Sequence, residues 1–225
     1  MNAPLHRLLQ IGLAFSVGSV ISVIGQTDKP ERTVDENVIT STRDPEVQVH
    51  LPPAASYIGA DRWILFGIAD CELHAFVKAD PQRNVQRLYW IQFEQYLPSK
   101  PELHHQYNSP RHTIIGGMDF YVDTWISTAD QKPKPGSDSE HIRGLIAHAG
   151  YTMPAATMGV RLVHLLDEAK RKELMIIYVE DLAPTGFTPG DLGQDGKAHD
   201  RWPMIEEELI ERAKNAIVIS RYAPL

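Results

Sequence analysis

Cysteine and basic charge are both scarce in this chain. Cys71 is the single thiol among 225 residues, so no disulfide can form within the chain. Lys and Arg number 22 against 29 Asp and Glu, which gives a net charge of −7. No basic stripe with interleaved aromatic residues occurs, and we therefore expect no nucleic-acid partner. A hydrophobic share of 43% is ordinary for a globular domain with a sizeable core.

The sequence also lacks the short motifs that identify a class of enzymatic reaction. It contains no G-x-S-x-G, no H-E-x-x-H and no C-x-x-C spacing. The stretch GDLGQDG at residues 190–196 does not follow the dinucleotide-binding pattern and is interpreted as a loop. No cofactor is assigned from the sequence.

Acidic residues are missing from the first 27 positions, where the only strong base is Arg7. An apolar run from Leu8 to Gly25 follows that base, which is the plan of a signal peptide. We predict that residues 1–25 are a signal peptide cleaved before Gln26. The alternative is an uncleaved membrane anchor formed by residues 8–25. Either way the protein is expected to be periplasmic or extracytoplasmic, and to touch a membrane only through that run.

The rest of the chain divides into an arm and one domain. Residues 26–55 are polar and punctuated by proline, which indicates a linker or arm with a short strand at Glu46–His50. Residues 56–225 are expected to form a single domain.

Alternation with a period of two dominates the start of this domain. From Trp63 to Val77 the odd positions carry no charge, which predicts a long strand with a bend near Gly67. A second strand is predicted at Val85–Leu97. Pairing Val77 with Val85 would keep the odd positions of both strands on one apolar side.

The remaining elements complete an α+β fold. A third strand is predicted at Met118–Thr128 and a helix after Ser137, which Gly150 would stop. Thr157–Leu166 and Glu173–Leu182 predict a hairpin, although residues 161–174 alternatively suit one helix. A last helix is predicted from about Arg201 to Ile217, with an inward stripe of Ile205, Leu209, Ala213 and Ile217. The predicted order is β-β-β-α-β-β-α: a mainly antiparallel sheet of about five strands with helices packed on one face.

The stretch IADCELHAF, residues 68–76, gathers side chains that can do chemistry. Strand alternation directs Asp70, Glu72 and His74 to one side and Cys71 to the other. The predicted register adds further polar and aromatic residues to the first side. This face is either solvated or the lining of a ligand pocket. Its candidate ligand-binding residues are Trp90, Gln92, Glu94, Asp119, Tyr121, Asp123 and Trp125, with Trp90 placed beside Glu72.

Two kinds of chemistry are open to that face. Asp70, Glu72 and His74 are candidate acid–base residues if burial shifts their pKa values. Glu72 and His74 are also candidate metal ligands together with Asp119 or Asp123. Cys71 is expected to be inert packing. The loop histidines His104, His105 and His112 are expected to be exposed, with surface capture of Cu or Ni as the alternative.

We therefore expect an exported, non-catalytic α+β domain that binds a small amphipathic ligand or a protein partner. Two alternatives stay open. One is an acid–base or metal-dependent enzyme that uses Asp70, Glu72 and His74. The other is a membrane-tethered accessory subunit of a complex.

Overall fold

A computed structural model of the chain describes residues 29–223. The predicted signal peptide or anchor, residues 1–25, lies outside this described range. Within residues 29–223, no helix combines the length and the apolar character that a membrane crossing requires.

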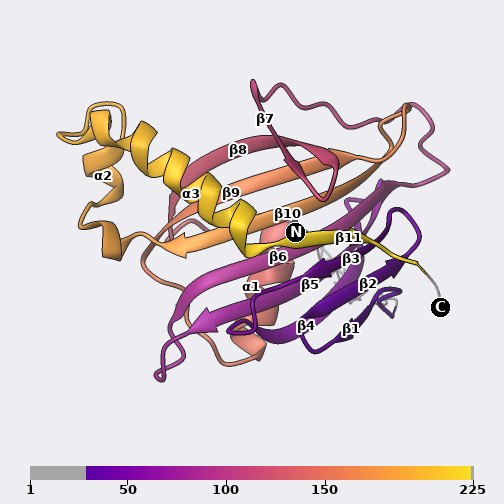
Figure 1. Cartoon of the computed structure of the whole chain (residues 1–225), viewed down its shortest axis with the longest axis horizontal. Helices are drawn as coiled ribbons and strands as arrows, with labels where there is room; N and C mark the ends of the chain where they lie inside the picture. The colour runs from indigo at the N-terminus through magenta and orange to yellow at the C-terminus, as the bar shows by residue number, and fades with distance from the viewer. Residues whose placement is uncertain (1–28, 224–225) are drawn as a thin grey trace, which may run out of the picture.

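Two antiparallel sheets form the framework of the protein (Figure 1). They contain eleven strands, so the antiparallel α+β class is confirmed, while β-structure is more extensive than the predicted five strands. The large sheet has the order β4 (Ser56–Leu65), β5 (Ala69–Ala79), β6 (Val85–Tyr96), β10 (Lys172–Asp181), β9 (Ala156–Leu165), β8 (Met118–Thr128) and β7 (Arg111–Ile115). The small sheet has the order β1 (Thr33–Asp35), β2 (Val38–Thr42), β3 (Glu46–His50) and β11 (Val218–Arg221).

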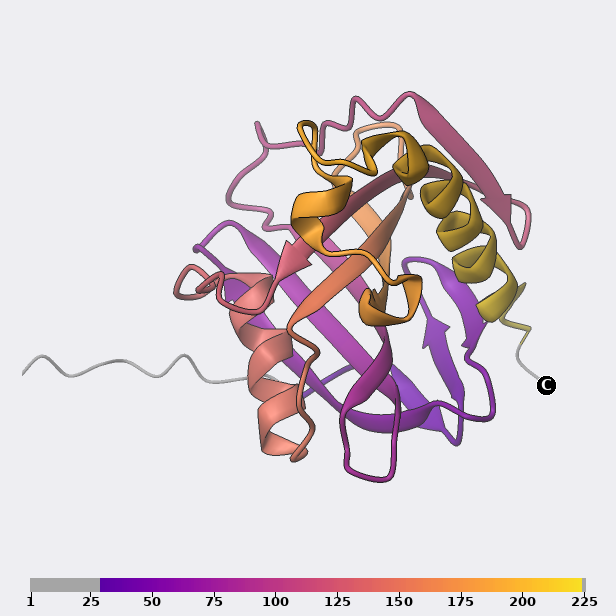
Figure 2. The same cartoon turned by 90° about the vertical axis from the view of Figure 1, so that its left-hand side faces the viewer.

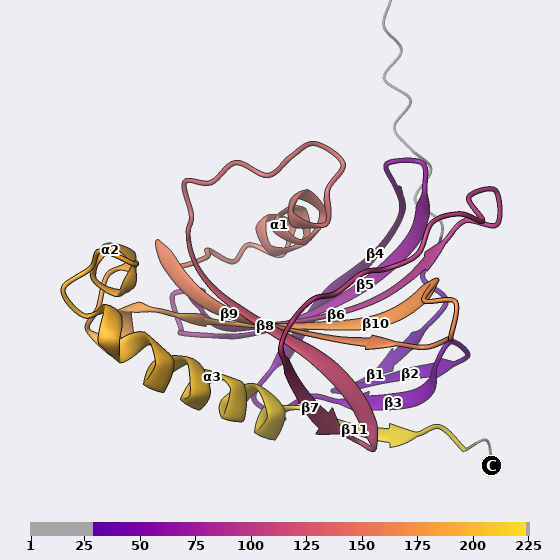
Figure 3. The ribbon, with the colours of Figure 1, turned by 90° about the horizontal axis from the view of Figure 1, so that it is seen from above.

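The helices lie on opposite faces of the large sheet, as Figure 3 shows from above. Helix α1 (Asp138–His148) covers one face, whereas α3 (Trp202–Ala216) and the small sheet cover the other. The predicted arrangement with helices on one face is therefore wrong. The physical reason is that strands such as β6 and β10 are apolar at odd and at even positions, so both faces need a cover. Two separate cores result.

Short helical segments join β10 to α3. They are η1 (Ala183–Thr185), α2 (Pro189–Leu192) and η2 (His199–Arg201). Helix α2 lies at the left-hand end of the molecule in Figure 1, the end that faces the viewer in Figure 2. The GDLGQDG stretch falls within this connection. The inward stripe of α3 is as predicted, with Ile205, Leu209, Ala213 and Ile217 all buried.

The segment predicted to be an arm contributes three strands to the small sheet. Its expected strand at Glu46–His50 is β3, and β2 pairs beside it. Val47 and Val49 of β3 and Ile39 of β2 are buried against the large sheet. Strand β11, from the far end of the described chain, closes the sheet by pairing with β3.

The long strand predicted from Trp63 is in fact a hairpin. Phe66 and Gly67 both have positive φ, 48° and 74°, and the Ile68 N–H donates to the Leu65 carbonyl at 2.9 Å. Two successive residues with positive φ form the tight turn of a β-hairpin. The expected bend near Gly67 is therefore the turn between β4 and β5.

The register of β5 on β6 also differs from the prediction. Cys71 lies opposite Glu94, and Ala75 lies opposite Trp90. The prediction paired Val77 with Val85. In the structure Ala79 pairs with Val85, and the register is irregular between Lys78 and Ala79. The resulting shift is an odd number of residues, which exchanges the two faces of β6. Even-numbered residues of β6 therefore share a face with Cys71, and Trp90 does not lie beside Glu72.

The other predicted elements agree with the structure. Strand β8 spans the predicted range Met118–Thr128, and β9 and β10 form the second hairpin rather than a helix. Helix α1 is followed by Gly150 at a φ of 74°.

Candidate functional site

The predicted ligand-binding residues all belong to the face of the large sheet that α1 covers, here called the α1 face. The registers place Trp90, Gln92 and Glu94 of β6 on this face with Cys71, Leu73 and Ala75. The pairings through β10 and β9 carry the same face to Tyr121, Asp123 and Trp125 of β8. Asp119 lies at the outer end of β8, where its carboxylate is 3.0 Å from the imidazole of His112.

Asp70, Glu72 and His74 point away from this set, toward the small sheet. Glu72 and His74 are 2% and 1% exposed. His74 Nε2 lies 2.9 Å from Glu72 Oε1, and Tyr57 Oη lies 3.3 Å from His74 Nδ1. Asp70 is bound by Arg62 at 2.9 and 2.6 Å. The predicted metal set that combined Glu72 and His74 with Asp119 or Asp123 is not assembled, because the sheet separates its members.

Glu72 is held in its ionised form despite its burial. Burial alone would raise its pKa, but hydrogen bonds from His74 and Arg32 and the charge of Arg32 outweigh it and lower the pKa. This carboxylate thus fastens residues 31–32 to β5. These contacts give Glu72 and Arg32 a structural role.

A group of three acids, one buried and two half-buried, occupies the α1 face at the end of β6. Its members, here called the acid cluster, are Glu94 of β6, Glu173 of β10 and Asp138 at the start of α1. Glu94 and Glu173 are register partners across neighbouring strands. Two sets of potential ligand atoms, each within 4.8 Å of one another, share Glu94: one with Cys71 and Asp138, the other with His105 and Glu173.

Burial changes the acidity of all three carboxyls. It raises the pKa of Glu94 to about 7, with repulsion from Asp138 as a further cause. Burial and then repulsion from Glu94 raise the pKa of Glu173 to about 8. Burial also raises the pKa of Asp138 and of the Cys71 thiol. Because like charges and low polarity both disfavour ionisation, the cluster retains protons near neutral pH.

His105 and Tyr107 close the cluster from the loop between β6 and β7. Tyr107 Oη donates to Glu173 Oε2 at 2.7 Å, and His105 Nδ1 lies 3.1 Å from the same oxygen. His105 Nε2 is buried and has no hydrogen-bond partner. Burial lowers the pKa of His105 to about 4, so its imidazole is neutral at pH 7.

The burial of His105 overturns the expectation that the loop histidines are exposed, since only 6% of this residue is accessible. The cause is Arg171, whose guanidinium donates to four carbonyls of the preceding loop at 2.7–3.3 Å: Tyr96, Leu97, Lys100 and Leu103. The His105 N–H then donates to the Lys170 carbonyl at 2.7 Å. His104 and His112 are exposed as expected.

An apolar pocket of about 380 Å³ lies between α1 and the sheet, next to the acid cluster. Trp90 and Trp125 form part of its wall, and Ile142 and Ile146 of α1 form another part. Trp125 lies flat over Gly159, where any side chain would overlap the indole. The pocket continues past Tyr151, Met153 and Pro154, the segment that follows α1.

Helix α1 is fixed over this pocket by its contact with β4. His141 stacks on Trp63 with ring centroids 4.0 Å apart, and its Nδ1 lies 2.7 Å from Asp61 Oδ2. The roof of the pocket is therefore anchored to the sheet by a polar contact and an aromatic one.

A chain of hydrogen bonds joins the pocket wall to the acid cluster. Trp90 Nε1 donates to Gln92 Oε1 at 2.9 Å, and Gln92 Nε2 donates to Glu94 Oε2 at 3.1 Å. The orientation of the Trp90 indole is thus coupled to that of the Glu94 carboxyl. One face of the sheet offers apolar and acidic surroundings side by side.

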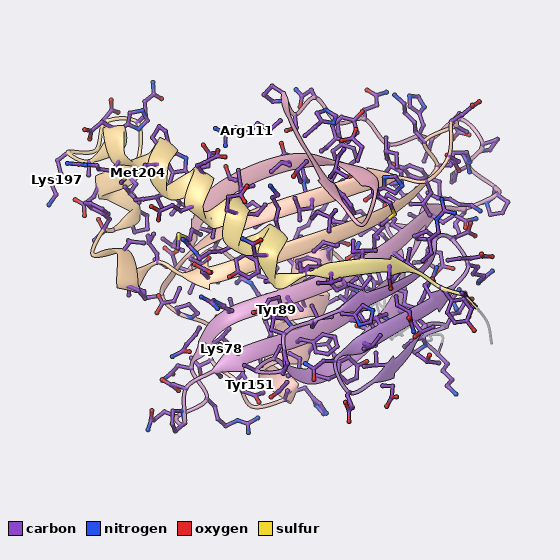
Figure 4. The ribbon with its side chains drawn as sticks, viewed as in Figure 1. Lys78, Tyr89, Arg111, Tyr151, Lys197 and Met204 are labelled. Atoms are coloured by element: carbon purple, nitrogen blue, oxygen red, sulfur yellow. The ribbon has the colours of Figure 1, made fainter. Side chains whose placement is uncertain are left out.

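A second groove, of about 640 Å³, lies on the opposite face beside α3. Figure 4 labels two of its lining residues, Lys78 and Met204. Glu180 at its floor is already paired with Arg87 and Arg212. Because several charged side chains line this groove, it is the less suitable site for an apolar ligand.

Sequence reasoning missed Asp138, His105, Tyr107 and Glu173 as members of the site. Glu173 had a signal, because it is the one charged residue among the odd positions of KELMIIYV. His105 and Tyr107 gave none, since their burial depends on contacts that Arg171 makes far along the chain.

These features define a class: an antiparallel α+β protein with an apolar pocket and a buried acid cluster under one helix. No protein-family model matches the chain, and no curated protein or solved structure matches it.

Proposed function

We propose that this protein binds a small amphipathic molecule in the pocket beneath α1. The observation that carries the proposal is the pocket itself, about 380 Å³ and walled by Trp90 and Trp125. Ligand sites typically measure about 300–1,000 Å³ and combine aromatic walls with few polar groups. The tryptophans belong to the residue set that the sequence alone indicated.

The polar end of the ligand is proposed to be an anionic group held by Arg143. This arginine lines the pocket from α1 and, within residues 29–223, has no hydrogen-bond or ion-pair partner. Ser139 lies one turn before it on the same helix and also lines the pocket. An apolar body against the tryptophans and an acidic group at Arg143 would satisfy both ends of the site.

Two steps test this proposal. Native mass spectrometry of the purified full chain should show a bound small molecule, which organic extraction would release for identification. Binding is then measured with anilinonaphthalene sulfonate, a fluorescent probe with apolar rings and an anionic group. Arg143→Gln should weaken binding of this probe by about tenfold, the equivalent of about 1.4 kcal/mol.

Ala147→Trp provides the sharpest variant, because Ala147 lines the pocket and yet is exposed on α1. The new indole should block the site while leaving the fold intact. His148→Trp is the matched control, since His148 is an exposed neighbour that does not line the pocket. Equal probe affinity in both variants would refute the site.

We also propose that the protein acts outside the cytoplasm, on the strength of the acid-free apolar run at residues 8–25. Expression of the full chain in a Gram-negative host should place it in the periplasmic or membrane fraction. An N-terminus near Gln26 would support cleavage, whereas a full-length soluble cytoplasmic product would refute export.

A further inference from the structure

The donor atoms of Glu94, His105 and Glu173 converge from three separate segments. Two carboxylate oxygens and one imidazole nitrogen lie within 4.8 Å of one another. Glu94 and Glu173 are fixed opposite each other by the β6–β10 register, and His105 comes from the loop that Arg171 holds. Two donors bonded to one ion at about 2.0–2.2 Å are at most about 4.4 Å apart, so only small side-chain rotations would bring all three onto one ion.

The surroundings of these donors contain more acid than base. Asp138 and Asp123 lie on the same face as the two glutamates. Two arginines are close to the donors. Arg161 Nη2 is 2.7 Å from Asp123 Oδ2, and the Arg171 guanidinium near His105 donates to four loop carbonyls, so both charges are already engaged. Buried carboxylates need a cation or a proton for compensation.

Within residues 29–223, three buried polar atoms around this site lack hydrogen-bond partners: His105 Nε2, Asp138 Oδ1 and Arg161 Nε. The His105 side chain is the decisive one, because this residue is only 6% exposed and belongs to the donor set. Buried polar atoms are rarely left without a partner in a folded protein. These atoms are an observation independent of the acidic character of the cluster.

We propose that Glu94, His105 and Glu173 form a binding site for one divalent transition-metal ion. The imidazole favours Zn²⁺, Fe²⁺ or Co²⁺ over Mg²⁺ and Ca²⁺, which prefer all-oxygen sites. The Tyr107 hydroxyl, which donates to Glu173 Oε2 at 2.7 Å, orients that ligand from outside the donor set. This site does not rest on the proposed ligand pocket, whose test uses different residues.

The second possible donor group, Cys71 and Asp138 with Glu94, is assigned a neighbouring role only. It offers one soft sulfur and two carboxylates from three elements but no imidazole. Glu94 cannot serve both groups with the same oxygen lone pair. Cys71→Ser therefore distinguishes the two donor sets.

Co²⁺ and Zn²⁺ are the probes for the experiment, which uses the full chain purified with chelator and then dialysed against each ion. Elemental analysis after gel filtration should find one bound ion per chain. Glu173→Gln and His105→Gln should each abolish retention while keeping the circular dichroism of the wild type. If Glu173→Gln does not fold, His105→Gln alone decides, because it changes no charge at pH 7.

Tyr107→Phe should keep the ion but weaken its affinity by about 10- to 100-fold, the usual effect of losing a partner of a ligand. Cys71→Ser should retain one ion. The matched control is His112→Gln, which removes an exposed imidazole 3.0 Å from a carboxylate on the edge strand β7, outside the proposed donor set. It should leave the metal content unchanged.

The proposal is overturned if the wild type retains no Co²⁺ or Zn²⁺, or if His105→Gln retains as much as the wild type. Loss of the ion in Cys71→Ser, or in His112→Gln, would likewise overturn this donor set. None of these outcomes depends on whether Ala147→Trp blocks the pocket.

Discussion

Arg32 and Glu72 are joined twice across the interface between the two sheets. The Arg32 backbone N–H donates to Glu72 Oε1 at 2.8 Å, and its guanidinium Nη1 donates to Oε2 at 3.2 Å. The Glu31 N–H adds a further bond to Oε2 at 2.8 Å. Glu72, whose side chain points away from the α1 face, therefore holds residues 31 and 32 at the beginning of the described chain.

Replacing Glu72 by Ala should destabilise the protein strongly. Loss of one partner of a buried charged pair costs about 3–5 kcal/mol, because Arg32 is left uncompensated. Denaturant unfolding followed by circular dichroism would measure the change. Asp70→Ala is the control on the same strand: its pair with Arg62 is half-exposed and should contribute about 0–1 kcal/mol. Similar midpoints for the two variants would contradict the structural role of Glu72.

The same carboxylate should make the fold sensitive to acid. The pKa of Glu72 is lower in the folded protein than its ordinary value of about 4.3, so the fold favours the ionised form. The contribution of ionised Glu72 to the free energy of unfolding is fully present above about pH 4.3. It is lost as the pH falls toward the pKa of Glu72 in the folded protein. Unfolding free energies of the wild type and of Glu72→Gln, measured from pH 7 to pH 3, should converge at the acid end. A constant difference across that range would refute the linkage.

Gly159→Ala should distort the ligand pocket. A Cβ at this position overlaps the Trp125 indole, which must move or strain its surroundings. Overpacking of this kind costs about 1–3 kcal/mol. Tryptophan fluorescence and probe binding should both change.

Gly144→Ala is the control for that substitution. Nothing lies within 4 Å of a Cβ there, and the residue is within α1. Alanine should stabilise the helix by up to about 1 kcal/mol and leave Trp125 undisturbed. If both variants quench Trp fluorescence alike, Trp125 does not depend on Gly159.

Cys71 should react slowly with a thiol reagent in the native protein and rapidly after denaturation. Its side chain is fully buried, and burial raises its pKa, so little thiolate is present. Absorbance of the released chromophore measures the rate. Fast native labelling would show that the cover formed by α1 opens readily.

The sequence predicted those elements whose signal is local. Alternation at Met118–Thr128 and in the β9–β10 hairpin placed the strands, and the spacing of Ile205 and Leu209 placed the last helix. Strands β1 and β2 were missed because TVD is too short for periodicity and VITST does not alternate, whereas the equally short EVQVH of β3 does.

The register of β5 on β6 could not be read from the pattern, because both faces of β6 are largely apolar. It depends on the turn at Asp80–Asn84, where Arg83 takes a positive φ of 66°. An odd shift there changed the neighbour of Trp90 from Glu72 to Ala75. Trp90, Gln92 and Glu94 were nevertheless predicted to share one face, since alternation sets the face within a strand independently of its partner. Glu173 of β10 was missed.

The strand order gives the large sheet a seam between β6 and β10. Strands β4, β5 and β6 follow one another as neighbours, and β7, β8, β9 and β10 do so as well, so each half can pair locally. The halves pair along β6 and β10, from Gln95 opposite Lys172 to Arg87 opposite Glu180, positions far apart in the chain. Closing so long a loop is the entropically costly step of such a topology. Glu94 and Glu173 face each other across this seam, so the acid cluster forms only when the two halves of the sheet join.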